Sequence, residues 1–170
     1  MLLYHYTSRV HLPRILRAGV LLPSTSNLDL VSEGRVHEAP DVVWLTSHDH
    51  PGAGHGLYRS VADKTEIRIT VELPRDWPKR WTKWAVAQGA SARGMGWLTD
   101  TGGGQEAADS WWVVTRPIPF RYWRAVEHRV GPLFVDGALV HELDWEAVEM
   151  ERTDGTVAPA FPTLYEGRAR

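Results

Sequence analysis

Two ionisable residues stand in segments that otherwise have the composition of β-strands. His5 lies in LLYHYT (2–7), and Glu127 lies in YWRAVEHRV (122–130). An ionisable group inside a sheet is costly unless it is paired or faces a cleft, where it can bind a polar substrate group or stabilise charge. Singly, each is more often a structural residue. As a pair, with Tyr58 between them in the sequence, they form the first candidate site.

A second candidate chemistry is metal binding by the histidines of HDHPGAGH, namely His48, His50 and His55. Imidazoles two residues apart on an extended segment share a face and could bind one ion. However, a glycine-rich loop does not fix the third ligand, and Asp49 would point away from the pair. We therefore expect exposed loop histidines and no metal, with a metal-dependent hydrolase as a remaining alternative.

The segment RDWPKRWTKW (75–84) alternates basic residues with tryptophans. The tryptophans follow helical i, i+4 and i+7 spacing and are expected to pack as one helix face: Trp77, Trp81 and Trp84. The cations Lys79, Arg80 and Lys83 would then form a positive ridge that could bind a substrate.

The pair Trp111-Trp112 belongs to a predicted strand, in which neighbouring side chains point to opposite faces. One of the two is therefore expected in the core, and the other could line a pocket. We take Trp112 as the candidate binding residue.

The hydrophobic pattern predicts a single α+β domain over residues 1–170, rich in strands and with two modest helices. Strands are expected over 2–7, 41–47, 66–73 and in several runs after 110. The first helix should begin after Ser8 and end at Gly19, and the second should cover 77–88. The segment from about 90 to 109, with Gly102 to Gly104, is expected to be a flexible loop, and the tail after about 153 is weakly patterned.

Composition narrows the function classes. The chain has 170 residues, a formal net charge of −2 and a pI near 6.4, so it has no global positive field for non-specific binding to nucleic acid. It has no cysteine, which removes disulfides, thiolate metal sites and a cysteine nucleophile. With neither a signal-peptide pattern nor a long apolar run, we expect a cytoplasmic protein that does not act at a membrane.

The opening pattern YHYTS, then LPRIL-x-x-G-V-L-x-P, resembles the first strand and helix of ADP-ribosyltransferases, especially the DarT-type DNA-targeting toxins. VVWLTS and GLYRSVADKTEIRITVEL look like the second landmark of that family, and AVEHRV looks like the late strand that begins with its catalytic glutamate. The order His, Tyr, Glu is that of the branch that includes the poly-ADP-ribose polymerases. The resemblance covers roughly residues 1–130, with Tyr6 where the polymerases have glycine.

The resemblance implies a split antiparallel sheet with few helices, and NAD as co-substrate. Glu127 would be the catalytic carboxylate that stabilises the oxocarbenium-like transition state, and His5 would hold a ribose. Nicotinamide would stack on Tyr58, with Trp44 as the alternative. Tyr6 and Thr7, which follow His5, would line the cofactor site.

The same resemblance implies a mono-ADP-ribosyltransferase, and it suggests a toxin with an antitoxin or immunity partner. Ala125, two residues before Glu127, stands where arginine-modifying members carry Gln or Glu, so arginine is not the implied acceptor. The acceptor would be nucleic acid or protein, bound by Lys79, Arg80, Lys83 and Trp112. NAD hydrolysis without transfer, and a non-catalytic module on the same fold, remain open.

Overall fold

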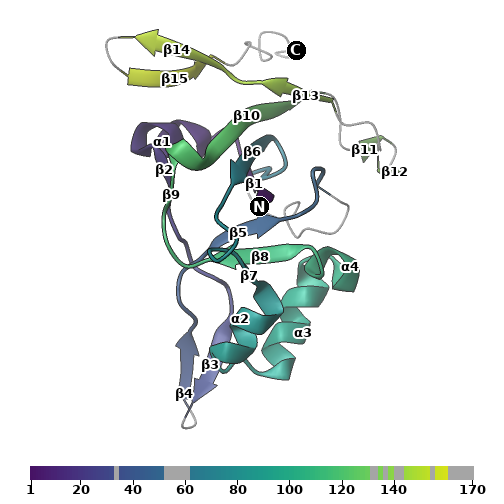
Figure 1. Ribbon diagram of the computed structural model, residues 1–170. Coiled ribbons are helices and arrows are strands. Elements are labelled where there is room, and N and C mark those ends of the chain that lie inside the picture. The colour runs from purple at the N-terminus through teal and green to yellow at the C-terminus, as the bar shows by residue number, and fades with distance from the viewer. Residues whose placement is uncertain are drawn as a thin grey trace.

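A computed structural model describes residues 1–32, 35–51, 62–130, 134–135, 138–139, 144–153 and 156–160. Its centre is an open antiparallel sheet of seven strands in the order β13-β10-β6-β1-β5-β8-β7 (Figure 1). The strands are β1 (Leu2–Thr7), β5 (Val43–Thr46), β6 (Ile67–Glu72), β7 (Lys79–Arg80), β8 (Trp111–Val114), β10 (Trp123–Val130) and β13 (Asp144–Ala147). The α+β class predicted from the sequence is confirmed.

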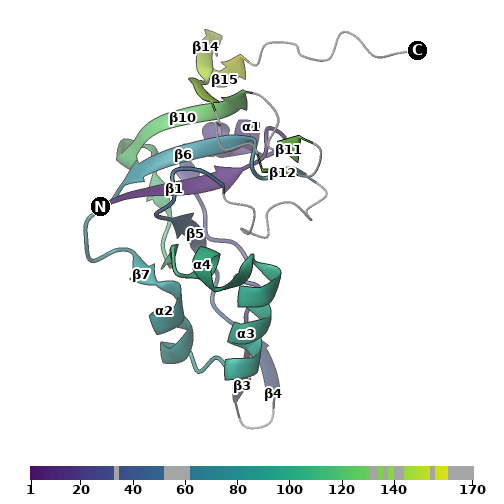
Figure 2. The same ribbon diagram turned by 90° about the vertical axis from the view of Figure 1, so that its right-hand side faces the viewer.

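Four small antiparallel pairs surround this sheet. They are β2 (Val20–Leu21) with β9 (Ile118–Pro119), β3 (Asp29–Ser32) with β4 (Arg35–Glu38), β11 (Phe134–Val135) with β12 (Ala138–Leu139), and β14 (Glu149–Thr153) with β15 (Thr156–Ala160). The α-helices of the described ranges are α1 (Leu12–Ala18), α2 (Trp81–Ala87), α3 (Ala92–Thr101) and α4 (Gly104–Ala108). Both ribbon views place α2, α3 and the β3–β4 hairpin beyond the β7–β8 end of the sheet, whereas α1 lies near β10 (Figures 1 and 2).

The predicted N-cap at Ser8 is wrong, because α1 begins at Leu12 with His11 as its N-cap, whereas the predicted end at Gly19 is confirmed. Ser8 instead stabilises the turn before the helix. The Ser8 hydroxyl accepts a hydrogen bond from the backbone N–H of His11, and Pro13 stands in the first turn of the helix, where its missing N–H costs nothing. Gly19 ends the helix with a φ of 62° and donates its N–H to the carbonyls of Ile15 and Leu16. This left-handed conformation is the reason for a glycine at this position.

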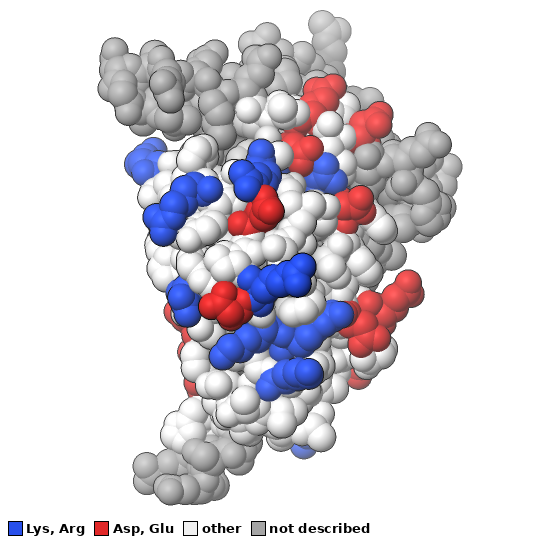
Figure 3. All heavy atoms as spheres, viewed as in Figure 1, with Lys and Arg blue, Asp and Glu red and all other residues white. Residues whose placement is uncertain are grey.

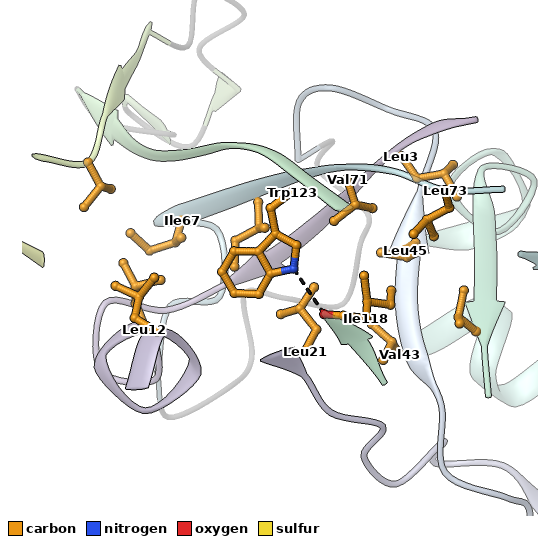
Figure 4. Packing of buried hydrophobic residues seen from close by; sticks show 14 residues of the cluster. Leu3, Leu12, Leu21, Val43, Leu45, Ile67, Val71, Leu73, Ile118 and Trp123 are labelled. Atoms are coloured by element: carbon orange, nitrogen blue, oxygen red, sulfur yellow. Dashed lines mark hydrogen bonds between the residues drawn. The ribbon is translucent and has the colours of Figure 1, made fainter. Parts of the chain in front are cut away.

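The main hydrophobic core joins α1 to one face of the sheet (Figure 4). Alternate residues of β1 and β6 supply it, including Leu3 and Ile67, and Leu12 covers them from the helix. Trp123 closes the centre of the cluster, and its indole Nε1 donates to the Ile118 carbonyl at 3.2 Å. A second cluster packs α2 and α4 against β5 and β8, and both Trp81 and Trp111 lie in it.

The tryptophan helix is shorter than the sequence predicts. Helix α2 begins at Trp81, because Lys79 and Arg80 pair with β8 as the edge strand β7. Trp81 and Trp84 are buried in the second cluster as expected, but Trp77 precedes the helix and packs against the first cluster instead. The prediction of one helical face formed by all three tryptophans is therefore wrong, since cross-strand pairing overrides the i, i+4 spacing.

The segment predicted as a flexible loop contains α3 and α4, so the expectation of two helices is also wrong. Ser91 caps α3 by accepting a hydrogen bond from the Gly94 N–H at 3.0 Å, and Gly102 ends the helix against the Trp111 ring. A sequence rich in glycine can form helices here because a tertiary contact and a cap offset its poor propensity. Within the described residues, no helix has the length and hydrophobicity needed to cross a bilayer.

Candidate functional site

Glu127 lies on β10 and is held by a neighbouring strand. It stands opposite Arg68 of β6, and the guanidinium donates Nε to Oε2 at 2.9 Å and Nη2 to Oε1 at 3.0 Å. The Thr70 hydroxyl lies 3.5 Å from Oε2. With side-chain exposures of 14% for Arg68 and 20% for Glu127, this is a largely desolvated bidentate pair. The carboxylate is therefore fixed in orientation.

Aromatic rings enclose the guanidinium of this pair. Arg68 lies 4.4 Å from the Trp145 ring centroid and 5.7 Å from that of Tyr4. The Tyr6 ring contacts Trp145 at 6.0 Å between centroids. We call Tyr4, Tyr6, Arg68, Glu127 and Trp145 the Glu127 cluster. It combines a carboxylate with flat apolar faces, which is a suitable composition for binding a polar ring-containing ligand.

The chain that follows β5 is tied to this cluster. Arg68 donates Nη1 to the Asp49 carbonyl, and the Tyr6 hydroxyl donates to the His48 carbonyl at 3.1 Å. Burial raises the pKa of Tyr6, so its phenol stays protonated and acts as a donor. Any ligand at Glu127 would therefore meet the backbone of residues 48–49.

His5 lies where β1 and β5 separate. These two strands share a single register pair, Tyr4 with Thr46, and the His5 Nδ1 lies 3.0 Å from the Trp44 carbonyl of β5. A carbonyl only accepts, so Nδ1 carries the proton, and burial lowers the pKa of His5. No group of the described residues bonds Nε2. The neutral ring therefore offers Nε2 as an acceptor.

The sheet register does not bring His5 and Glu127 onto one face. His5 pairs with Ile69 and Glu127 pairs with Arg68, and these two partners are adjacent in β6. Because paired residues share a face and adjacent ones alternate, His5 belongs to the face of the first core cluster and Glu127 to the opposite face. The sequence shows both strands but not their register.

Other predicted cofactor residues divide in the same way. Tyr6 belongs to the Glu127 cluster, whereas Thr7 is buried opposite Ile67 on the His5 face. The Trp44 ring packs against Trp81 and Trp111, with centroids at 6.4 and 5.8 Å, and its position in that cluster is structural. Tyr58 lies outside the described residues, so its predicted stacking on nicotinamide stays a prediction.

The candidate metal histidines are only partly described. His48 and His50 stack with parallel rings 5.8 Å apart, and His50 Nδ1 lies 2.9 Å from Asp49 Oδ1. That hydrogen bond lowers the pKa of Asp49. Among the described residues, no three groups are placed to hold a metal ion together, and His55 lies outside those residues.

The predicted basic ridge is present on the surface. Lys79, Arg80 and Lys83 are exposed, and the Arg80 guanidinium lies 4.3 Å from the centroid of Trp112. Trp111 is buried and Trp112 half-buried, pointing to opposite faces as the alternation predicts. Trp111 belongs to the second core cluster and Trp112 packs against the first, so both indoles contact a core.

Sequence reasoning missed three members of the Glu127 cluster, Tyr4, Arg68 and Trp145. The alternation in EIRITVEL places Arg68 on the face opposite Ile67 and Ile69, but no sequence signal connects it with Glu127. The resemblance ends before Trp145, which joins the cluster through the pairing of β13 with β10. Compared with protein-family models, curated proteins and solved structures, the chain has no match.

Proposed function

We propose that the protein is an NAD-dependent mono-ADP-ribosyltransferase on a split-sheet fold of ADP-ribosyltransferase type. The observation that carries this proposal is the position of His5, whose neutral ring offers Nε2 at the β1–β5 junction. The junction consists of one register pair, and this short pairing supports a split of the sheet at this point. The resemblance of the opening segment and the Arg68-bound carboxylate on a nearby strand add support.

His5 is chemically suited to bind a ribose. With Nδ1 anchored on the Trp44 carbonyl, Nε2 can accept a hydrogen bond from a ribose hydroxyl. The lowered pKa keeps that acceptor free of a proton near neutral pH. Glu127 belongs to the other face of the sheet, so one NAD molecule that contacts both residues would have to cross the sheet where a single register pair joins β1 and β5.

Glu127 would act on the nicotinamide ribose. In the reaction the bond from C1′ to nicotinamide breaks and its electron pair leaves with nicotinamide. The positive charge that develops on the ribose is stabilised by a carboxylate hydrogen-bonded to its hydroxyl, and an acceptor nucleophile then bonds to C1′ and loses its proton. Arg68 and Thr70 occupy part of the acceptor capacity of Glu127, so a lone pair remains for a ribose hydroxyl.

Incubation with adenylate-labelled NAD and separated cell fractions tests this proposal. The wild-type protein should transfer label to a macromolecular fraction, or release ADP-ribose if water is the acceptor. Glu127→Gln should lower the rate by about 100-fold or more, because an electrostatic contribution to the transition state is lost. Glu72→Gln, which removes an exposed carboxylate on the neighbouring strand, is the matched control and should keep the rate. A wild-type protein that neither binds nor consumes NAD contradicts the proposal.

The ion pair itself favours a second candidate, a nucleotide-binding module without catalysis. Arg68 bonds both carboxylate oxygens, which limits how far Glu127 can engage a substrate. Titration calorimetry separates the two functions. The module would bind NAD with wild-type Glu127 and show no turnover, and both His5→Ala and Arg68→Met would weaken that binding.

A further inference from the structure

Strand β13 forms one edge of the seven-stranded sheet, at the end opposite β7 (Figure 1). Its four residues pair on one side with β10, in a register that sets Trp145 opposite Arg129 and Ala147 opposite Glu127. Among the residues that the structure describes, no further strand pairs with β13. An unpaired edge presents backbone N–H and C=O groups to which another extended chain can bind.

The register shows which backbone groups of β13 face outward. The Val148 N–H donates to the Val126 carbonyl at 2.9 Å, so this opposite pair is hydrogen-bonded across the two strands. Hydrogen-bonded and non-hydrogen-bonded pairs alternate along an antiparallel ladder. By this alternation Trp145 and Ala147 direct their N–H and C=O groups to the open edge, and the other two residues of β13 direct theirs to β10. Neither outward N–H has an acceptor within the described residues.

The two faces of β13 differ in chemistry. Asp144 and Glu146 project on one face and are exposed, the Glu146 side chain to 65%. Trp145 projects on the other face, which is that of Glu127 and its cluster. Figure 3 shows acidic side chains over the β10–β13 end of the sheet, away from the main group of Lys and Arg over β7 and β8. A strand that binds at this edge therefore meets carboxylates on one face and an indole on the other.

We propose that the outer edge of β13 binds an extended segment of a partner polypeptide in which basic and apolar residues alternate. In the antiparallel arrangement of the rest of the sheet, the basic side chains lie opposite Asp144 and Glu146. The apolar side chains lie opposite Trp145 and Ala147, and both kinds of cross-strand pair are favourable.

The same chemistry argues against other occupants. A second copy of this chain fits poorly, because an antiparallel register that joins the outward groups sets one carboxylate against another. A nucleic acid lacks the regular N–H and C=O groups of a strand, and the acidic face repels its phosphates. The edge thus selects a polypeptide by its backbone and a basic segment by its charge.

Fluorescence anisotropy with a labelled octapeptide of alternating lysine and valine, (Lys-Val)4, tests the proposal. Valines that lie opposite Trp145 and Ala147 donate their N–H groups to β13, whereas the lysine N–H groups point away from it. N-methylation of the valines should weaken binding by about 20-fold, because two hydrogen bonds that contribute about fivefold each are lost. N-methylation of the lysines keeps the same charge and should leave affinity within about threefold. Since NAD is absent, the outcome is independent of the proposed transferase activity.

Variants of the protein test the charge and the edge separately. Asp144→Asn/Glu146→Gln should weaken binding of (Lys-Val)4 by about threefold to tenfold at low salt, because two exposed charge pairs are lost. The matched control Asp100→Asn/Glu106→Gln removes the same charge from exposed positions of α3 and α4 and should leave affinity within about twofold. Ala147→Pro removes an outward N–H at an edge position where proline is tolerated, so binding should weaken by at least about fivefold while the urea midpoint is kept. Equal losses in the acidic and control variants, equal effects of methylation at valine and lysine, or tighter binding of (Glu-Val)4 or oligo(dT) would overturn the proposal.

Discussion

The bidentate pair of Arg68 and Glu127 should couple strands β6 and β10 energetically. We expect Arg68→Met to lower the free energy of unfolding by about 3 kcal/mol, because it leaves a largely buried carboxylate without its counter-charge. Glu127→Gln should lower it by about 2 kcal/mol, since an amide keeps one acceptor oxygen for the guanidinium. Methionine retains apolar packing against Trp145, so the first loss mainly reports charge and hydrogen bonding.

The size of the coupling follows from burial and geometry. Exposed ion pairs couple by about 0.2–1 kcal/mol, and charge-assisted hydrogen bonds at desolvated positions contribute about 1.5–3 kcal/mol. With both side chains at or below 20% exposure and two bonds near 3.0 Å, we expect about 2 kcal/mol of coupling. The double variant should therefore lose about 3 kcal/mol rather than the additive 5 kcal/mol.

Urea unfolding of the wild type, both single variants and the double variant measures this cycle. A loss of about 3 kcal/mol should also lower Tm by roughly 6–12 °C for a domain of this size. The pair Glu72 and Arg124 provides the internal control, because its side chains are 49% and 60% exposed. Its cycle should give less than about 1 kcal/mol. If the two cycles give equal coupling, the reasoning from burial is refuted.

Two further predictions concern pH and glycine positions. The pKa of His5 is lowered by burial from its ordinary 6.5, so the unfolded state binds more protons than the native state as pH falls below 6.5. The free energy of unfolding should therefore fall as pH falls below 6.5. The variant His5→Asn can still donate to the Trp44 carbonyl but does not titrate, so the urea midpoint should depend less on pH. An unchanged pH dependence would assign the effect to other groups. Gly102→Ala should cost about 2–3 kcal/mol, because a Cβ would overlap the Trp111 ring and approach the Leu98 carbonyl to 2.8 Å. Gly96→Ala, in an open position of α3, should instead stabilise by about 0.5–1 kcal/mol, and thermal melts that rank the two alike would contradict this account.

Local sequence patterns determined much of the sheet. The apolar and aromatic run LLYHYT and the alternation in EIRITVEL predicted β1 and β6 to within a residue at each end, because both patterns report side chains that meet a core. Gly19 likewise marked the end of α1, whereas the Ser8 hydroxyl bonds within the turn that precedes the helix. The glycine-rich segment after residue 90 was predicted to be a loop because its helix propensity is low. It forms helix α3 because Gly102 packs against the Trp111 ring, a contact that the local sequence does not show.

The site depended on a quantity that no local pattern contains, the register between strands. The sequence alone identified His5 and Glu127 as ionisable residues in strands, the basic residues at 79–83, and the α+β class. The tertiary structure paired Glu127 with Arg68, placed His5 on the other face, and set the edge strand β13 beside Glu127. A shift of one residue in pairing reverses every side chain of a strand, so the faces were fixed only when the distant strands β1, β6 and β10 packed together.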